Sequence, residues 1–113
     1  MFAYAEDGRA QLAFASMHDE AAQCVAEEIG RLRALSYEEL LRYEDHALHC
    51  EMLSAAGDVL IRETQVFSDS GGKGGDLRVL VDVWNPEGGR WGVVGSIAKE
   101  DFIKAPDGSF VDE

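Results

Sequence analysis

Two histidines and a thiol lie close together in Asp-His-Ala-Leu-His-Cys-Glu, at residues 45–51. Imidazoles and thiolates are common zinc ligands in proteins. On a helix, His46, His49 and Cys50 would share one side, with His18 as a candidate fourth ligand. On a strand, His46 and Cys50 would share one face and His49 would point the other way. We therefore name His46, His49 and Cys50 as candidate metal ligands, which would converge only if the segment is helical.

The same segment gives weaker support for catalysis. Cys50 beside His49 has the residue types of a nucleophile and its base, but neighbours on a strand point in opposite directions. Glu51 and Glu63 would form an acid–base couple if they faced each other across the following hairpin. Cys24 falls on the apolar side of a predicted helix, where a thiol packs and does not react. No G-x-S-x-G motif is present, so the sequence favours a binding protein over an enzyme.

Four glycines surround Lys73 in Ser-Asp-Ser-Gly-Gly-Lys-Gly-Gly-Asp, at residues 68–76. A phosphate-binding P-loop needs Ser or Thr directly after the lysine and then a helix. Here Gly74 follows Lys73, and the next segment has the alternation of a strand. The aspartates of the loop would also repel a phosphate. We interpret the stretch as a hairpin loop and expect no cofactor.

Two tryptophans flank a turn rich in glycine at residues 85–90. Trp84 and Trp91 would face each other across a hairpin as an aromatic pair. Tryptophan and arginine are enriched at the centres of protein interfaces, and Arg90 lies next to the pair. We therefore predict an interaction surface formed by Trp84, Arg90 and Trp91. The alternative is a pair that only holds the hairpin over the core.

The chain of 113 residues has 22 acidic and 10 basic residues, which gives a formal net charge of -12. Such a surface repels phosphate backbones and anionic lipids, so we expect no nucleic-acid or membrane partner. It attracts a basic protein, as an immunity-type inhibitor of a basic partner would. The two cysteines are far apart in the sequence, which predicts reduced thiols and a cytoplasmic protein.

Helical spacing and capping residues predict two helices in the first half. Apolar residues recur at helical intervals behind a capping pattern at Ser16, which predicts a helix over residues 19–34. A second capping pattern at Ser36 predicts a short second helix. Residues 44–53 fit either a continuation of that helix or a strand that leads into a Gly-Asp hairpin turn. We prefer the strand.

The second half has the apolar alternation of β-strands. Including the strand preferred above, the predicted strands are residues 46–53, 59–67, 77–84 and 91–97. Helices followed by strands predict an α+β fold, with an N-terminal helix and a short second helix on one face of a roughly four-stranded antiparallel meander sheet. We expect residues 17–113 to form this single domain and residues 1–16 to be an N-terminal extension.

The second face of such a sheet would be unusually apolar, because Leu80, Trp84 and Val94 would lie on it. Either the C-terminal tail or a second subunit would have to cover these side chains. We therefore predict a homodimer.

Two short motifs resemble those of small uncharacterised bacterial proteins of α+β type. They are Leu-Ser-Tyr-Glu-Glu-Leu-Leu at residues 35–41 and Ala-Pro-Asp-Gly-Ser-Phe-Val-Asp-Glu at residues 105–113. The resemblance covers residues 17–113 and implies no catalytic residue. The half-apolar second sheet face and the absence of a catalytic constellation in the sequence predict a small non-enzymatic protein-interaction module. The alternative is a small enzyme or metal-binding protein that uses the histidines and cysteine of residues 46–51.

Overall fold

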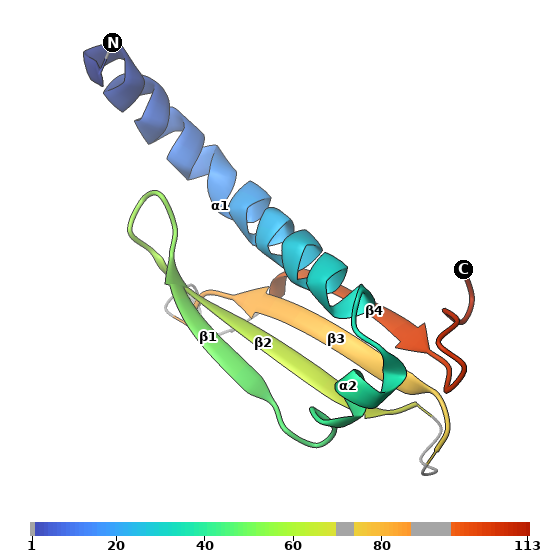
Figure 1. Cartoon of the computed structure of the whole chain (residues 1–113). Helices are drawn as coiled ribbons and strands as arrows, with labels where there is room; N and C mark the ends of the chain where they lie inside the picture. The colour runs from blue at the N-terminus through green and yellow to red at the C-terminus, as the bar shows by residue number, and fades with distance from the viewer. Residues whose placement is uncertain (1, 70–73, 87–95) are drawn as a thin grey trace.

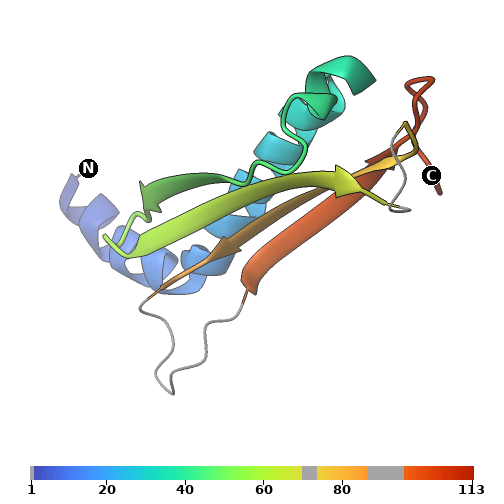
Figure 2. The same cartoon turned by 90° about the horizontal axis from the view of Figure 1, so that it is seen from below.

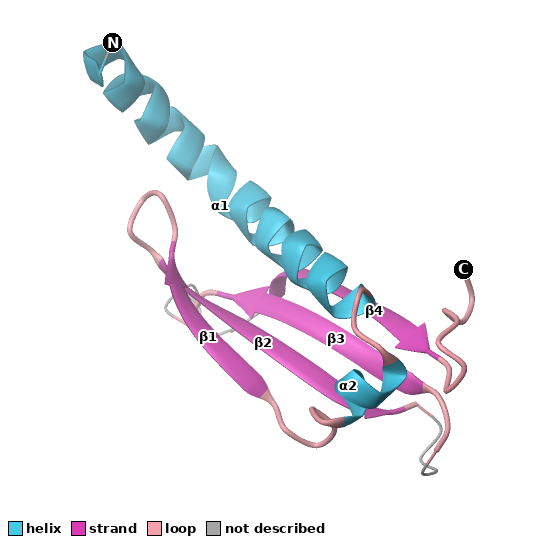
Figure 3. Cartoon of the chain, viewed as in Figure 1, coloured by secondary structure: helices cyan, strands magenta, loops and turns pink. Residues whose placement is uncertain are grey.

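The structure is a computed structural model and describes residues 2–69, 74–86 and 96–113. Two helices, α1 (Phe2–Arg33) and α2 (Tyr37–Leu41), precede a four-stranded sheet (Figures 1 and 3). Its strands are β1 (Leu48–Leu53), β2 (Val59–Ser68), β3 (Leu77–Trp84) and β4 (Ser96–Lys104). Each strand pairs antiparallel with the next along the chain, in the order β1-β2-β3-β4. The predicted α+β fold is confirmed, and so is the strand interpretation of residues 44–53.

Helix α1 is longer than predicted. It begins at Phe2, whereas the capping pattern at Ser16 predicted a start near residue 19, and that prediction is wrong. Residues 2–16 are rich in alanine and contain no proline. Because extending an existing helix is much easier than nucleating one, such a sequence continues the helix toward the N-terminus. In the part of the chain that the structure describes, no helix has the apolar run needed to cross a membrane.

Helix α2 begins where its sequence predicts. The Ser36 hydroxyl accepts a hydrogen bond from the Glu39 amide at 3.0 Å, and the Glu39 carboxylate accepts one from the Ser36 amide at 2.9 Å. This reciprocal capping box satisfies amides that have no partner within the helix. Tyr37 and Leu40 of α2 are buried in the same core as the apolar side of α1.

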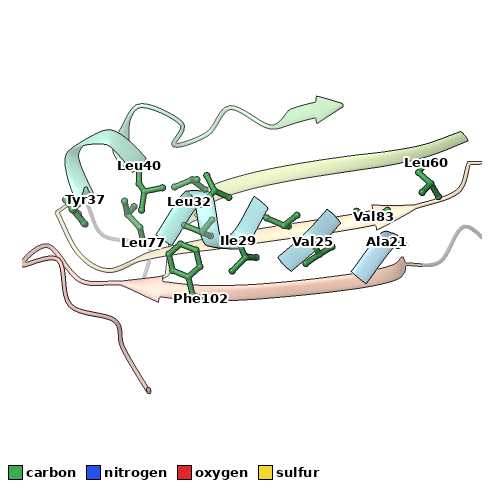
Figure 4. Packing of buried hydrophobic residues seen from close by; sticks show 13 residues of the cluster. Ala21, Val25, Ile29, Leu32, Tyr37, Leu40, Leu60, Leu77, Val83 and Phe102 are labelled. Carbon is green, nitrogen blue, oxygen red and sulfur yellow. The ribbon is translucent and has the colours of Figure 1, made fainter. Parts of the chain in front are cut away.

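The core lies between the helices and one face of the sheet (Figure 4). The buried apolar residues of α1 recur at helical spacing and form one stripe along it. They are Ala21, Val25, Ile29 and Leu32. Every second residue of β3 is buried against this stripe, as the sequence alternation predicts.

Strand β4 lies later in the chain than predicted. The expected strand at residues 91–97 overlaps β4 only at its end, and residues 91–95 lie outside the described residues. The charged run from Lys99 to Asp101 hides the alternation of β4 in the sequence. Its position is visible only from pairing, in which Phe102 lies opposite Val79 of β3. The tail then folds back, and Phe110 packs edge-on against Phe102 with ring centroids 5.7 Å apart.

The glycine-rich stretch joins β2 to β3, as its interpretation as a hairpin loop predicts. The Asp69 amide donates a hydrogen bond of 2.9 Å to the Asp76 carbonyl, which closes the base of the loop. The Tyr37 hydroxyl donates one of 2.6 Å to the Gly75 carbonyl. Lys73 lies outside the described residues.

Candidate functional site

The open face is the side of the sheet turned away from α1, and in Figure 2 the strands lie in front of that helix. Because side chains alternate along a strand, the pairing places on this face the odd-numbered residues of β1, β2 and the later part of β4, and the even-numbered residues of β3. Its half-buried apolar side chains include Ile61, Phe67, Leu80 and Trp84. The pairing therefore confirms that Leu80 and Trp84 share this face, whereas Val94 lies outside the described residues.

A row of four ionisable side chains crosses the open face, with one residue from each strand. We call it the polar row, and in order from β1 to β4 it contains His49, Glu63, Asp82 and Lys99. The His49 Nε2 atom lies 2.9 Å from a Glu63 carboxylate oxygen. The sequence shows these residue types, but only the register of the strands shows that they are neighbours.

Trp84 borders the polar row and contacts it. Its ring lies edge-on to the His49 ring, with centroids 6.3 Å apart and planes at 90°. Since β2 separates the two strands, the two side chains meet above β2. The predicted partner Trp91 and the predicted interface residue Arg90 lie outside the described residues. Of the three predicted interface residues, Trp84 is the one among the described residues, and it lies on the open face beside the polar row.

Asp82 is the unusual member of the polar row. Its Oδ1 atom is buried and accepts no hydrogen bond from any described residue. Glu63 lies directly opposite on β2, where like charges destabilise a sheet, and Lys99 lies directly opposite on β4. A buried acceptor without a donor costs about 1–3 kcal/mol. The centre of the open face therefore carries two facing carboxylates, Glu63 and the half-buried Asp82, whose negative charge a cationic group from outside the chain would offset.

The other side of the sheet carries a separate charged cluster beneath α1. Glu28 of α1 is 5% exposed. Arg31 donates two hydrogen bonds of 2.9 Å to its carboxylate, and the Thr64 hydroxyl donates one of 3.2 Å. Arg62 approaches the same carboxylate at 3.9 Å. These contacts join the helix to β2, so we assign the cluster a structural role.

The thiol of Cys24 lies near this cluster and 3.5 Å from the Met52 sulfur. Burial raises the pKa of the Cys24 thiol, which keeps it protonated and therefore weakly nucleophilic. This agrees with the prediction that Cys24 packs and does not react.

The structure does not bring the three candidate metal ligands together. His46 precedes β1, and its Nδ1 atom lies 2.8 Å from the Glu44 carbonyl oxygen. His49 is on the open face, whereas Cys50 is on the side that faces α1. Among the described residues, no group of three His, Cys, Asp or Glu side chains is placed to hold a metal. The metal site stays a sequence prediction, which elemental analysis of the purified protein would test.

The acid–base couple that the sequence raised is not formed. Glu51 lies opposite Ile61 in the register of β1 and β2, and Glu63 lies opposite His49. The prediction that the two glutamates face each other is wrong, because it required a different register of the hairpin. The sequence predicts His49, which pairs with Glu63, only as a metal ligand or as a base for Cys50.

Comparison with known protein families, characterised proteins and solved structures gives no match. The functional assignment therefore rests on the geometry of the open face. Sequence reasoning missed Glu63, Asp82 and Lys99 as neighbours. The sequence shows that these residues lie in successive predicted strands. To find that they are neighbours, one also needs to know how the strands are aligned with each other.

Proposed function

We propose that the chain is a non-enzymatic protein-binding module whose open face accepts a cationic segment of a basic partner. The observation that carries this proposal is the pair of facing carboxylates of Glu63 and half-buried Asp82, whose Oδ1 atom has no donor among the described residues. A lysine or arginine of the partner would donate a charge-assisted hydrogen bond to Asp82 and offset its repulsion with Glu63. The bound state would then remove a cost that the free protein carries.

The apolar side chains around the polar row fit the same role. Trp84 and its cross-strand neighbour Ile61 lie on one side of the row, and Leu80 lies on the other. Tryptophan contributes strongly at interface centres, and its ring face attracts an arginine guanidinium. A segment with alternating cationic and apolar residues would complement both parts of the face.

The net charge of the chain supports a basic partner further. A formal charge of -12 accelerates encounter with a cationic protein and opposes encounter with nucleic acid. An immunity-type inhibitor, which blocks a basic protein by covering it, is one protein of this kind. A cytoplasmic location is part of the proposal and agrees with the two free cysteines.

A thiol-based enzyme has less support from the geometry. Cys50 lies on the side of the sheet that faces α1, whereas His49 lies on the open face. A nucleophile and its base must approach within hydrogen-bond distance. The paired His49 and Glu63 instead lie beside Trp84 on an open sheet surface, which suits a protein contact.

The proposal is tested by calorimetric titration with a synthetic peptide of alternating arginine and leucine residues. Asp82→Asn keeps the shape of the side chain and removes its charge, and we expect it to weaken binding about tenfold. Asp19→Asn is the matched control, because Asp19 is exposed on α1 and its replacement changes the net charge equally. We expect the control to bind like the unaltered chain, and Trp84→Ala to bind more weakly.

The outcomes separate a specific face from a general charge effect. Equal losses for Asp82→Asn and Asp19→Asn would show that only the overall charge attracts the peptide, and the proposed site would be wrong. Tight binding of a peptide of alternating glutamate and leucine residues would also contradict it. Circular dichroism of each variant checks that the fold is retained.

A further inference from the structure

Strand β1 lies at the edge of the sheet and pairs only with β2 among the described strands. Edge strands usually carry protection against pairing with another chain, such as charged side chains (lysine above all), proline or a bulge. β1, with the sequence Leu-His-Cys-Glu-Met-Leu, carries no lysine, proline or bulge, and Glu51 is its only carboxylate. Leu48 and Leu53 at its ends are 40% and 71% exposed. At the opposite edge, the tail covers one end of β4 through a hydrogen bond from Val111 to Ile103.

The sequence of β1 complements itself when two copies run antiparallel. Side chains directly opposite each other across two strands lie on the same face of the sheet. With a two-fold axis through Cys50, His49 faces Glu51 of the second copy on the open face. On the other face, Leu48 faces Met52 of the second copy, and the two Cys50 residues face each other. An imidazole that can donate a hydrogen bond therefore meets a carboxylate, and apolar side chains meet apolar ones.

Neighbouring registers lack this complementarity. With the axis at Glu51, two carboxylates would face each other and His49 would face Leu53 of the second copy. With the axis at His49, the two imidazoles would face each other and Leu48 would face Cys50. Like charges at directly opposite positions are destabilising. The register centred on Cys50 is therefore favoured because it places an imidazole opposite each carboxylate, avoids facing carboxylates and pairs apolar side chains.

The side chains of a strand added beside β1 have room on the face of the sheet that carries α1. Helix α1 packs mainly on β3 and β4. Between α1 and the outer strands lies a groove of about 400 Å³, lined by residues that include Cys24, Glu27, Met52 and Arg62. An added strand would place every second side chain on this helix-bearing face. These side chains would lie beside Met52, at the edge of the groove.

We propose that two copies of the chain associate through β1, antiparallel and centred on Cys50, to form one continuous eight-stranded sheet. This dimer differs from the homodimer predicted from the sequence, in which a second subunit covers the open face, because pairing at the sheet edge leaves that face uncovered. The two-fold axis is normal to the sheet, so both open faces lie on the same side. His49, already 2.9 Å from Glu63, would then have a carboxylate on each side.

The inference does not rest on the proposed function, but it would strengthen it. Two open faces on one side of a continuous sheet can bind two segments of one partner, which raises the apparent affinity through effective concentration. Failure of the dimer would leave the single open face intact. Failure of peptide binding would leave the β1 pairing intact, so the two experiments give separate answers.

The first test is sedimentation equilibrium of the full chain over a range of concentrations. We expect a monomer–dimer equilibrium, and we expect Glu51→Arg to weaken it at least about tenfold, because an arginine then faces His49. Glu38→Arg is the matched control, since Glu38 is exposed on α2 and the charge change is the same. A monomeric mass for the unaltered chain, or equal effects of the two variants, would overturn the proposal.

The second test measures the position of Cys50 and does not depend on a variant of Glu51. In Cys24→Ser protein, treatment with diamide should join the two Cys50 thiols into a disulfide, with the hydrogens transferred to diamide. The product would run as a dimer that reductant reverses. We expect no such product from Cys50→Ser protein with Cys24 retained. A dimer in solution without Cys50 cross-linking would contradict the proposed register, because an open-face dimer holds Cys50 on the far side of each sheet.

Discussion

Replacing Glu28 by alanine is expected to lower the free energy of unfolding by about 3 kcal/mol. Its carboxylate is buried beneath α1 and accepts hydrogen bonds from Arg31 and Thr64. Alanine would leave the buried Thr64 hydroxyl without this acceptor, and the half-buried Arg62 without its nearby carboxylate. Groups that are buried without partners cost more than a lost surface contact. The helix would therefore lose its polar connection to β2 as well as one ion pair.

Glu27→Ala is a close control for this prediction. Glu27 is the preceding residue of α1 and is exposed, with a hydrogen bond of 3.3 Å from Gln23. Both variants replace glutamate by alanine in the same helix, so their effects on helix propensity and net charge match. Urea denaturation should show a loss for Glu27→Ala within about 0.5 kcal/mol. Equal losses for the two variants would mean that burial of Glu28 contributes no net stability.

The contribution of Glu28 should also depend on pH. Hydrogen bonds from Arg31 hold the pKa of the Glu28 carboxyl below its ordinary value of 4.5, although burial acts in the opposite direction. As the pH falls, the unfolded chain therefore binds this proton before the folded chain does. The stabilisation is complete above pH 4.5 and is lost as the pH falls through the lower folded pKa. The unfolding free energies of Glu28→Ala and unaltered protein should thus converge in acid.

Local sequence signals predicted the elements that depend on local interactions. Ser36 and Glu39 lie three positions apart, which is all that a capping box requires, and α2 begins there. The alternation of residues 77–84 predicts both a strand and its buried face, and β3 has that pattern. In each case the determining contacts join residues that are close in the sequence or follow a simple period.

Strand β4 and the polar row, which the sequence did not predict correctly, depend on contacts between distant residues. β4 contains consecutive charged residues, and only its pairing with β3 makes residues 96–104 a strand. The polar row is a clearer example. His49 and Glu63 become neighbours because the hairpin has one particular register, and a shift of this register would separate them. No periodic pattern in the sequence specifies that register.

Replacing Lys104 by methionine is expected to lower the free energy of unfolding by about 2 kcal/mol. Lys104 is 7% exposed, although lysine is almost never buried without partners. Its Nζ atom donates hydrogen bonds to the Leu35 carbonyl at 2.6 Å and the Arg33 carbonyl at 3.3 Å. These carbonyls lie at and just beyond the end of α1, where the helix dipole is negative. Methionine would occupy similar volume but would donate no hydrogen bond.

Lys99→Met is the matched control, because Lys99 is an exposed lysine on the same strand. We expect its effect to stay within about 0.5 kcal/mol, as for most surface substitutions. The Lys104 ammonium also lies 4.9 Å from the Phe110 ring, so its loss should loosen the tail where that ring packs. Hydrogen exchange in Lys104→Met protein should therefore increase at the Val111 amide, which donates to Ile103 at 2.9 Å. Equal stability losses for the two lysine variants would mean that the contact of β4 with the end of α1 contributes nothing beyond the packing that methionine preserves.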